Sequence, residues 1–253
     1  MSPTPRNWDA QTYAQVSAPQ QAWAQEQFAR IGALSGEELI LDAGCGSGNI
    51  TAQLSEMVPN GHVYAVDFSP AMVEHTQALL GDRVTASCQD LQELELPQPV
   101  DLIFSNATFH WIHDHQKLFN ALHRALKPGG QLVAQCGGKG NIEQFRKVPE
   151  QIASMPPFAE HFKDDKPWFY ANAEETRERL ERAGFTEIET WLAPRPTTLE
   201  DVRPFITTVC LLPMLNQLPD DLREPFTDAV LEVTGEPLTL DYVRLNMTAR
   251  RAE

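Results

Sequence analysis

Short apolar runs alternate with amphipathic segments through the middle of the chain. Between residues 38 and 137, short apolar runs recur; the first two, at residues 39–41 and 63–66, each end at an aspartate. The intervening segments place apolar side chains at helical spacing; residues 115–126, for example, carry Leu118, Phe119 and Leu122 on one face. This alternation predicts buried parallel strands wound with helices on both faces of a sheet.

The predicted strands and helices follow directly from this pattern. The strands are expected at residues 39–43, 62–67, 84–88, 100–105, 131–136, 185–192 and 238–249. The helices are expected at residues 20–31, 49–58, from 70 onward, 115–126 and 173–183, with two more in 199–235 divided near Pro219. The fold class is therefore α/β.

The alternation stops after residue 137, where a segment rich in Lys, Asp and Pro begins. Aromatic residues are interspersed there, among them Trp168, Phe169 and Tyr170, which favours an ordered insertion over a linker. We expect it to form a lid with the helices of 199–235. The predicted parts are an N-terminal helical segment (1–37), a ligand-binding core (38–138), a cap insertion (139–172), a continuation of the core (173–194), a helical cap (195–236) and the last strand of the core (237–253).

A glycine-rich turn follows the first predicted strand. Gly44, Gly46 and Gly48 stand at alternate positions, and Asp42 precedes them at the carboxyl end of the strand, where open α/β sheets bind ligands. A dinucleotide motif, G-x-G-x-x-G, would need glycine at the position of Asn49. A carboxylate beside the turn would repel a pyrophosphate and attract an ammonium group, so the pattern disfavours an NAD-dependent oxidoreductase.

With its acid and three glycines, this segment resembles the first motif of the class I S-adenosylmethionine (SAM)-dependent methyltransferases, D/E-x-G-x-G-x-G. The resemblance covers most of residues 38–137. It implies a doubly wound, mostly parallel, seven-stranded Rossmann-like sheet, to which the later segments would add a helical cap. It also implies SAM as the cofactor and S-adenosyl-L-homocysteine as its product.

The resemblance implies cofactor-binding roles for residues that follow the second and third predicted strands. Asp67 would accept hydrogen bonds from both ribose hydroxyls, or would cap the following helix instead. Phe68 and Met72 would flank the adenine. Asp90 would meet the adenine amino group and the backbone N–H of Leu91 the ring, although Asp90 also fits an ordinary loop acid.

A narrower resemblance begins at Asn106, which follows the fourth predicted strand. The pair His110-Trp111 and the N-terminal aromatic-plus-Gln segment are similar to those of trans-aconitate methyltransferase-like and juvenile-hormone-acid methyltransferase-like enzymes. In those relatives the N-terminal segment folds over the cofactor. The cofactor-binding residues expected from both resemblances are Asp42, Gly44, Cys45, Gly46, Asp67, Phe68, Met72, Asp90, Leu91, Asn106, Tyr13 and Gln21.

The same relatives methylate carboxylates of small acids, and close kin methylate oxygen, nitrogen or carbon in small metabolites. The catalytic candidate is His110, which would act as a base toward a hydroxyl, hold a carboxylate as a donor, or only pack against Trp111. A carboxylate acceptor is already ionised near neutral pH and needs no base. An anion-holding cation could come from Lys139, Arg146, Arg195 or Arg203.

The composition restricts the kinds of molecule that the protein is expected to bind. With 35 acidic and 20 basic residues the net charge is −15, which argues against a nucleic-acid surface but permits a small anionic substrate. No apolar run approaches the roughly 20 residues of a membrane span, and the first residues lack the apolar region of a secretory signal. The four cysteines form no CxxC pair, and His113 and His115 have no evident third ligand, so no metal is expected. A cytoplasmic location follows as an expectation; the oligomeric state stays open.

The sequence therefore predicts SAM-dependent methyl transfer to a small, partly apolar molecule, most readily O-methylation of a carboxylate or hydroxyl. The alternatives are N- or C-methylation of a secondary metabolite and a non-catalytic SAM-binding sensor. Methylation of RNA or DNA is disfavoured by the charge and by the sequence Asn106-Ala-Thr-Phe109, where an Asn/Asp-Pro-Pro-Tyr/Phe tetrad would stand.

Overall fold

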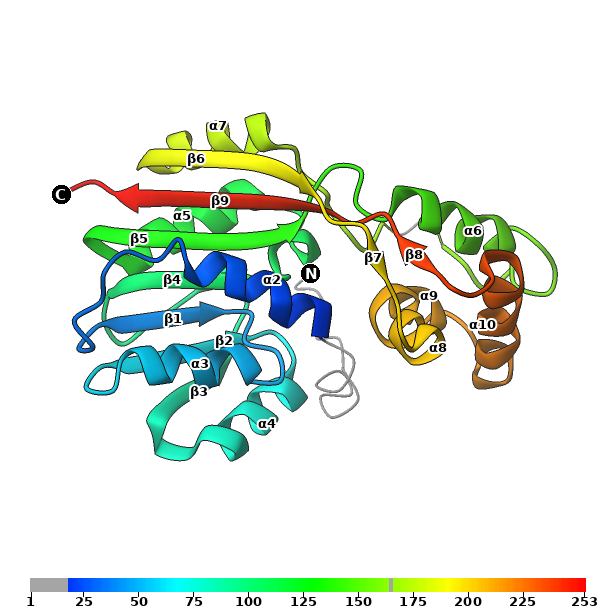
Figure 1. Ribbon diagram of the computed structural model, residues 1–253, viewed down its shortest axis with the longest axis horizontal. Coiled ribbons are helices and arrows are strands. Elements are labelled where there is room, and N and C mark those ends of the chain that lie inside the picture. The colour runs from blue at the N-terminus through cyan, green and yellow to red at the C-terminus, as the bar shows by residue number, and fades with distance from the viewer. Residues whose placement is uncertain (1–17, 164–165) are drawn as a thin grey trace.

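Seven strands form one sheet in the order β3-β2-β1-β4-β5-β9-β6, and the computed structural model describes residues 18–163 and 166–253 (Figure 1). Strands β1 to β5 are parallel, whereas β9 runs antiparallel to both β5 and β6. The predicted doubly wound, mostly parallel sheet is confirmed. The strands are β1 (Leu39–Ala43), β2 (His62–Asp67), β3 (Val84–Cys88), β4 (Val100–Asn106), β5 (Leu126–Gly137), β6 (Phe185–Pro194) and β9 (Val243–Arg251).

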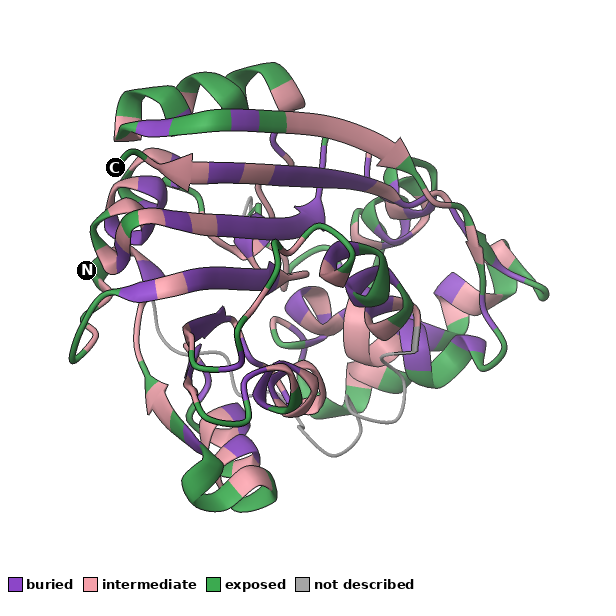
Figure 2. Ribbon diagram, turned by 60° about the vertical axis from the view of Figure 1, so that its left-hand side comes forward, coloured by how far each residue is buried: buried purple, intermediate pink, exposed green. Residues whose placement is uncertain are grey.

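Helices cover both faces of this sheet, so successive side chains of its central strands enter two different cores. Ile40 packs with α2 and α3 on one face, and the next residue, Leu41, packs with α5 and α7 on the other. Figure 2 shows the central strands buried along most of their length. The helices on the sheet are α2 (Ala18–Phe28), α3 (Asn49–Met57), α4 (Pro70–Leu80), α5 (His115–Ala125) and α7 (Ala173–Ala183).

A helical lobe, here called the cap, lies beyond the carboxyl ends of the parallel strands (Figure 1). It has its own core, in which Phe145, Phe205 and Phe226 pack together with Trp23 of α2. The cap therefore packs against the helix that covers the sheet. Its elements are α6 (Glu143–Ala153), β7 (Thr197–Thr198), α8 (Val202–Phe205), α9 (Leu212–Leu215), α10 (Asp220–Thr234) and β8 (Thr239–Leu240).

Two details of the cap differ from the sequence prediction. The segment before Pro219 is not one helix, because a π-helical turn at Ile206–Cys210 separates α8 from α9. The last strand does not begin at residue 238, since Thr239 and Leu240 pair with β7 instead. The Asp241 carboxylate accepts a hydrogen bond from the backbone N–H of Gln144 at 2.8 Å, which ties the chain to the start of α6 before β9 begins.

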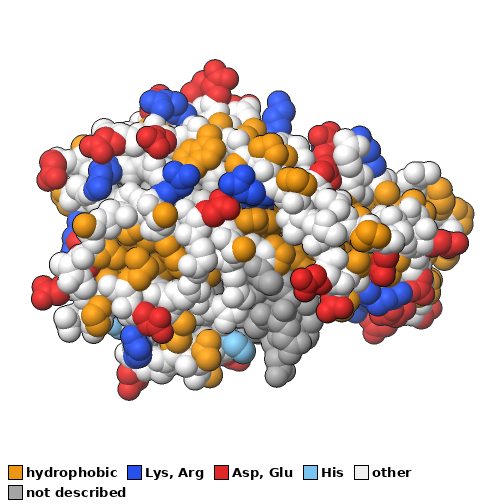
Figure 3. Space-filling view, viewed as in Figure 1, with side chains coloured by type: hydrophobic (Ala, Val, Ile, Leu, Met, Phe, Trp, Pro, Cys, Tyr) orange, Lys and Arg blue, Asp and Glu red, His pale blue; other side chains and the backbone are white. Residues whose placement is uncertain are grey.

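Charged side chains of both signs are mixed on the face drawn in Figure 3, where Lys and Arg side chains are separated by acidic and apolar ones. On the cap, Arg203 forms ion pairs with Glu224 and Asp228 of α10. Within the described ranges, no helix combines the length and the apolar character needed to cross a bilayer.

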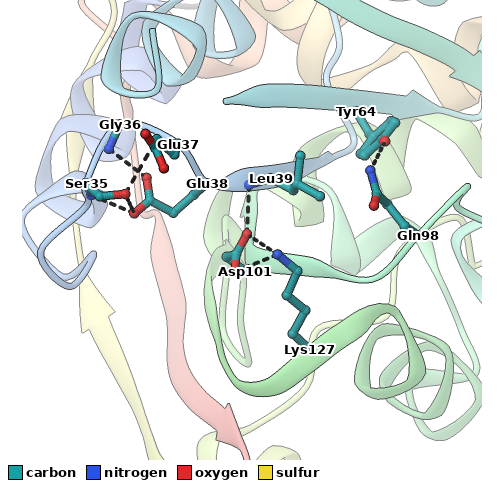
Figure 4. Close-up of polar contacts among 9 residues, drawn as sticks. All are labelled: Ser35, Gly36, Glu37, Glu38, Leu39, Tyr64, Gln98, Asp101 and Lys127. Atoms are coloured by element: carbon teal, nitrogen blue, oxygen red, sulfur yellow. Dashed lines mark hydrogen bonds and ion pairs between the residues drawn. The ribbon is translucent and has the colours of Figure 1, made fainter. Parts of the chain in front are cut away.

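Two carboxylates organise the amino-terminal edge of the sheet (Figure 4). Glu38 Oε1 accepts hydrogen bonds from the backbone N–H and the hydroxyl of Ser35 at 2.6 and 2.7 Å, and its Oε2 accepts from Gly36 N–H at 2.9 Å. Asp101 accepts from Leu39 N–H at 2.8 Å and pairs with Lys127 at 2.8 Å. Both acids thereby fix the entry of the chain into β1.

Replacing Glu38 by Gln should lower the stability of the fold in a pH-dependent way. Burial acts to raise the pKa of Glu38, but the Ser35 and Gly36 donors outweigh it and lower the pKa to about 2. A depressed carboxyl pKa stabilises the fold above the unfolded pKa near 4.5, and this stability is lost as the pH falls toward 2. We expect Glu38→Gln to cost about 1 kcal/mol at pH 6 and progressively less below pH 4.5.

Urea unfolding of the wild type and the variant at pH 6, 4.5 and 3.5 measures this difference. Glu37→Gln is the matched control, because the neighbouring side chain is exposed and should leave stability unchanged. A constant difference between wild type and Glu38→Gln at all three pH values would contradict the assigned role.

Candidate active site

The glycine turn between β1 and α3 is tied to the end of β2. The backbone N–H groups of Gly44 and Cys45 both donate to Val66 O, at 2.7 and 3.0 Å, and Gly46 N–H donates to Asp67 Oδ2 at 3.0 Å. Gly44 has a φ of +90°, and a Cβ there would lie 2.0 Å from Thr108 Oγ1. Glycine is required at this position by both the backbone conformation and the close approach of the segment after β4.

Two carboxylates lie at the ends of β1 and β2. Asp42 is 1% exposed and accepts a hydrogen bond from Thr51 Oγ1 at 2.7 Å; burial, with a smaller contribution from Asp67, raises its pKa to about 7. Burial also raises the pKa of Asp67, although Ser69 and Gly46 N–H donors oppose the shift. A carboxylate pair in a poorly solvated site is stabilised by a bound cation.

Asp67 is consistent with both of its sequence interpretations. Its Oδ1 accepts a hydrogen bond from Ser69 N–H at 2.8 Å, just before α4 begins, and its Oδ2 is held by the glycine turn. One carboxylate thus joins the two segments that would flank a ribose. Asp42, in contrast, is buried behind the turn and would act on a ligand through its charge.

Two buried acceptor atoms near the same turn lack a donor among the residues that the structure describes. Asn106 donates through Nδ2 to Gln20 O at 2.9 Å, which leaves Asn106 Oδ1 buried and without a hydrogen-bond partner there. Gln20 Oε1 is in the same condition. Buried acceptors of this kind need a donor, and the ammonium group of SAM is one. Acceptor oxygens and carboxylates together fit a cationic ligand, so the residues present fit SAM.

The residues expected around the adenine follow neighbouring strands. Gln89 N–H donates to Asp67 O at 3.0 Å, which holds the end of β3 beside that of β2. Asp90 accepts a hydrogen bond from Gln92 N–H at 2.9 Å and caps a short 3-10 helix, as the plain loop interpretation requires. Met72 and Leu91 are buried, Phe68 is partly exposed, and the adenine contacts stay a prediction.

The structure describes only one of the two N-terminal residues predicted to bind the cofactor. Gln21 lies in α2, next to Gln20, and is partly buried. Tyr13 lies outside the described residues.

A cavity of about 40 Å³ lies between the cap and the segment that follows β4. Five aromatic residues contribute to its walls: Trp23, Trp111, Trp168, Tyr170 and Tyr242. Trp168 and Tyr170 belong to the segment that the sequence predicts to form a lid, whereas Trp23 lies in α2 and Tyr242 precedes β9. Phe205 and Leu211 are buried in the core of the cap.

The backbone is strained at two places in the cavity wall. Ala107 has a φ of 58° and Ile142 a φ of 44°, both in the left-handed region that side chains other than glycine rarely adopt. Each such residue costs on the order of 1 kcal/mol, and strain of this kind is typical of functional sites. Ala107 N–H donates to Gln135 O at 2.7 Å, which fixes the turn that leads from Asn106 to His110.

His110 lines the cavity and is 8% exposed. The backbone N–H of Gly137 donates to its Nδ1 at 3.3 Å, and its carbonyl accepts from Phe169 N–H at 2.8 Å. Its ring stacks on Tyr170 with centroids 5.9 Å apart. A Cβ at position 137 would lie 2.7 Å from the Tyr170 ring, so glycine there permits this packing.

The imidazole of His110 is neutral near pH 7. Burial, then the positive charge of Arg244, and then His115 lower its pKa well below 6.5. Because Nδ1 accepts a hydrogen bond, the single ring proton is on Nε2, and His110 can offer that N–H as a donor.

Sequence reasoning missed the cation of this cavity, which is Arg244 of β9. The four candidates Lys139, Arg146, Arg195 and Arg203 are not among the cavity-lining residues. Arg195 instead pairs with Glu26 at 2.8 Å. The available signal was an arginine that alternates with apolar residues in the sequence Val243-Arg-Leu245.

His113 is exposed, whereas His115 is buried. Across the described residues, no group of three or more His, Cys, Asp or Glu side chains could hold an ion. His115 is 1% exposed, and its Nε2 lies 3.0 Å from Phe109 O. Burial lowers its pKa to about 4.

Comparison with known proteins identifies the family of this chain. Residues 40–130 match the family model described as a methyltransferase domain. The chain is 30% identical over 195 residues to a trans-aconitate 2-methyltransferase from Methylobacterium nodulans, covering 77% of this chain and 70% of that one. It is also 30% identical over 257 residues to an uncharacterized methyltransferase from Schizosaccharomyces pombe, covering 96% and 98% of the two chains.

A solved structure shares the fold. It is phosphoethanolamine N-methyltransferase 2 from Haemonchus contortus in complex with phosphomonomethylethanolamine and S-adenosylhomocysteine, with a TM-score of 0.63 and 21% identity. The match covers 96% of this chain and 57% of that one.

Replacing Asp67 by Asn should weaken SAM binding. The variant keeps the shape of the side chain but removes the charge and one acceptor of the ribose hydroxyls, so the dissociation constant should rise roughly 5- to 150-fold. Isothermal titration calorimetry with SAM measures it.

Asp82→Asn is the control, because that acid lies in the exposed turn after α4 and should leave SAM affinity unchanged. Equal SAM affinity in the wild type and Asp67→Asn would rule out the ribose contact.

Proposed function

The chain belongs to the class I SAM-dependent methyltransferases, in the group of the trans-aconitate 2-methyltransferases, and we propose that it methylates a carboxylate oxygen of a small organic acid. SAM, when bound, supplies a methyl group on a positively charged sulfur that is transferred in line to a nucleophile. The acceptor would occupy the cavity beside His110, next to the turn that fits the cofactor.

The absence of a base from the described cavity wall carries this proposal. His110 is the natural candidate, but burial and Arg244 lower its pKa well below 6.5, and its Nδ1 already accepts the Gly137 N–H. Tyr170 and Tyr242 keep their protons, because burial raises the pKa of each. An acceptor that must lose a proton in the transition state would therefore meet, in the described part of the lining, no side chain suited to take it.

A carboxylate does not need that help, since its ordinary pKa near 4 leaves it ionised at neutral pH. It needs positioning, exclusion of water and a donor, and the Nε2–H of His110 supplies a donor without charge. A phenol, alcohol or protonated amine would require a base. The carboxylate is therefore favoured over the hydroxyl, nitrogen and carbon acceptors.

The cavity also favours an acceptor that is partly apolar. Trp23, Trp111 and Trp168 contribute large apolar surfaces beside the polar groups of the lining.

The pH dependence of kcat/KM should lack a histidine ionisation. His110 stays neutral throughout the range above its lowered pKa, and the carboxylate acceptor is ionised above about pH 5. We expect kcat/KM for the acceptor, measured with methyl-labelled SAM at a saturating concentration, to be constant between pH 6 and 8. A decline below pH 7 that disappears in a His110 variant would identify His110 as a base and contradict the proposal.

Substitution of His110 separates the donor role from the base role. His110→Gln retains an N–H donor near the position of Nε2, so kcat should fall by less than about tenfold. His110→Phe keeps the ring packing on Tyr170 but removes the donor, which should reduce kcat/KM roughly 10-fold or more. Equal losses in the two variants would show that donation by His110 is not used.

A further inference from the structure

Arg244 is the one side chain with a permanent positive charge among the described residues that line the cavity. It extends from β9 and is 3% exposed. Its Nε donates to Gln135 Oε1 at 2.7 Å, and its guanidinium carbon lies 4.4 Å from the centroid of Trp23 and 5.8 Å from that of Tyr242. These contacts fix the direction of the guanidinium group, which is suited to planar recognition of a carboxylate.

The charge of Arg244 acts on groups around the cavity. It contributes to lowering the pKa of His110. Burial raises the pKa of Tyr170 and of Tyr242, and Arg244 opposes that rise in both. These three side chains line the same cavity, so an anion within it would interact with Arg244 as well.

The aromatic wall presents nearly parallel rings. Trp168 and Tyr170 have centroids 6.1 Å apart and planes inclined by 10°, and Tyr170 and His110 have planes inclined by 24°. Trp111 continues the wall, with its ring 5.7 Å from that of Trp168. Ring faces stack most favourably on another flat π system.

The charge of the cavity lining limits how many carboxylates an acceptor can carry. A tricarboxylate would bring three negative charges to a cavity whose described lining holds one permanent cation, Arg244. Buried carboxylates without a partner are costly, and the protein as a whole has a net charge of −15. One carboxylate, in contrast, is matched by one arginine.

From these features we propose that Arg244 positions the carboxylate of the acceptor, and that the acceptor is a flat, unsaturated or aromatic monocarboxylic acid. This inference rests on the proposed function, carboxylate methylation, and narrows its substrate class. An oxygen of the carboxylate bonds to the methyl carbon as the carbon–sulfur bond breaks, giving a neutral methyl ester and neutral S-adenosylhomocysteine. The negative and positive charges cancel, so no proton has to move.

A panel of acids tests the substrate class with methyl-labelled SAM and the full chain. The panel contains cinnamate, its saturated analogue 3-phenylpropanoate, trans-aconitate, a phenol and a primary amine. We expect ester formation from cinnamate with kcat/KM at least about tenfold above the values for 3-phenylpropanoate and trans-aconitate.

The outcomes distinguish the inference of a flat monocarboxylic acid from the proposed function, carboxylate methylation. Methylation of trans-aconitate or 3-phenylpropanoate as efficiently as cinnamate would overturn the inference of a flat monocarboxylic acid and leave carboxylate methylation standing. Methylation of the phenol or the amine, with none of the acids, would overturn the proposed function and with it this inference.

Substitution of Arg244 tests its role. Arg244→Gln should raise KM for cinnamate roughly 10- to 150-fold, with a smaller change in kcat and an unchanged dissociation constant for SAM. Arg244→Lys keeps the charge and should recover part of that loss. Arg203→Gln is the matched control, because Arg203 lies on the cap surface and should leave KM unchanged. An unchanged KM for cinnamate in a folded Arg244→Gln variant would overturn the assignment.

A binding measurement on the unaltered protein keeps the test decisive if the variants do not fold. Trp23, Trp111 and Trp168 line the cavity, so their fluorescence should report an acceptor bound in the presence of S-adenosylhomocysteine. Cinnamate should bind at least about tenfold more tightly than cinnamamide, which has the same flat body without the charge. Equal binding of the two would contradict recognition by Arg244.

Discussion

The site carries negative side chains where the cofactor is expected and a positive side chain in the acceptor cavity. The rest of the structure depends on this separation of charge. Asp42 and Asp67 stand at the ends of β1 and β2, where they suit a cationic methyl donor. Arg244 stands in β9, in the wall of the cavity, where it suits an anion. Methyl transfer from a sulfonium to a carboxylate cancels both charges, so a poorly solvated site favours the reaction more than water does. Neither the cationic methyl donor nor the anionic acceptor requires the protein to move a proton.

The fold creates this separation of charge by placing β9 antiparallel between β5 and β6. The start of β9 thereby meets the carboxyl end of β5, and Arg244 reaches Gln135. Trp23 of α2 packs both with the core of the cap and against Arg244. The helix over the sheet, the last strand and the cap thus share one contact region at the cavity.

Local patterns made most of the sheet predictable. The expected bounds of β1, β2, β3 and α7 agree with those of the structure, because buried apolar runs and glycine or proline boundaries determine them within a few residues. The glycine turn could be identified for the same reason. The cap was less predictable, since the pairing of Thr239 and Leu240 with β7 and the tie from Asp241 to α6 depend on distant residues.

The acceptor side of the site could not be predicted from sequence because its determinants are non-local. The tautomer of His110 is set by the backbone of Gly137, which the sequence places 27 residues away. Arg244 looks like an ordinary polar residue of a strand until β9 is placed beside β5. Sequence therefore identified the cofactor, whose motif is contiguous, and left open whether His110 acts as a base.

The separation of charge can be tested by comparing two occupants of the cofactor site. Sinefungin has an amine, positively charged when protonated, where SAM has its methylated sulfur, and S-adenosylhomocysteine is neutral there. The dissociation constant of the tightest-binding carboxylic acid should be roughly tenfold or more lower in the sinefungin complex than in the S-adenosylhomocysteine complex. Equal affinity in the two complexes would contradict the account.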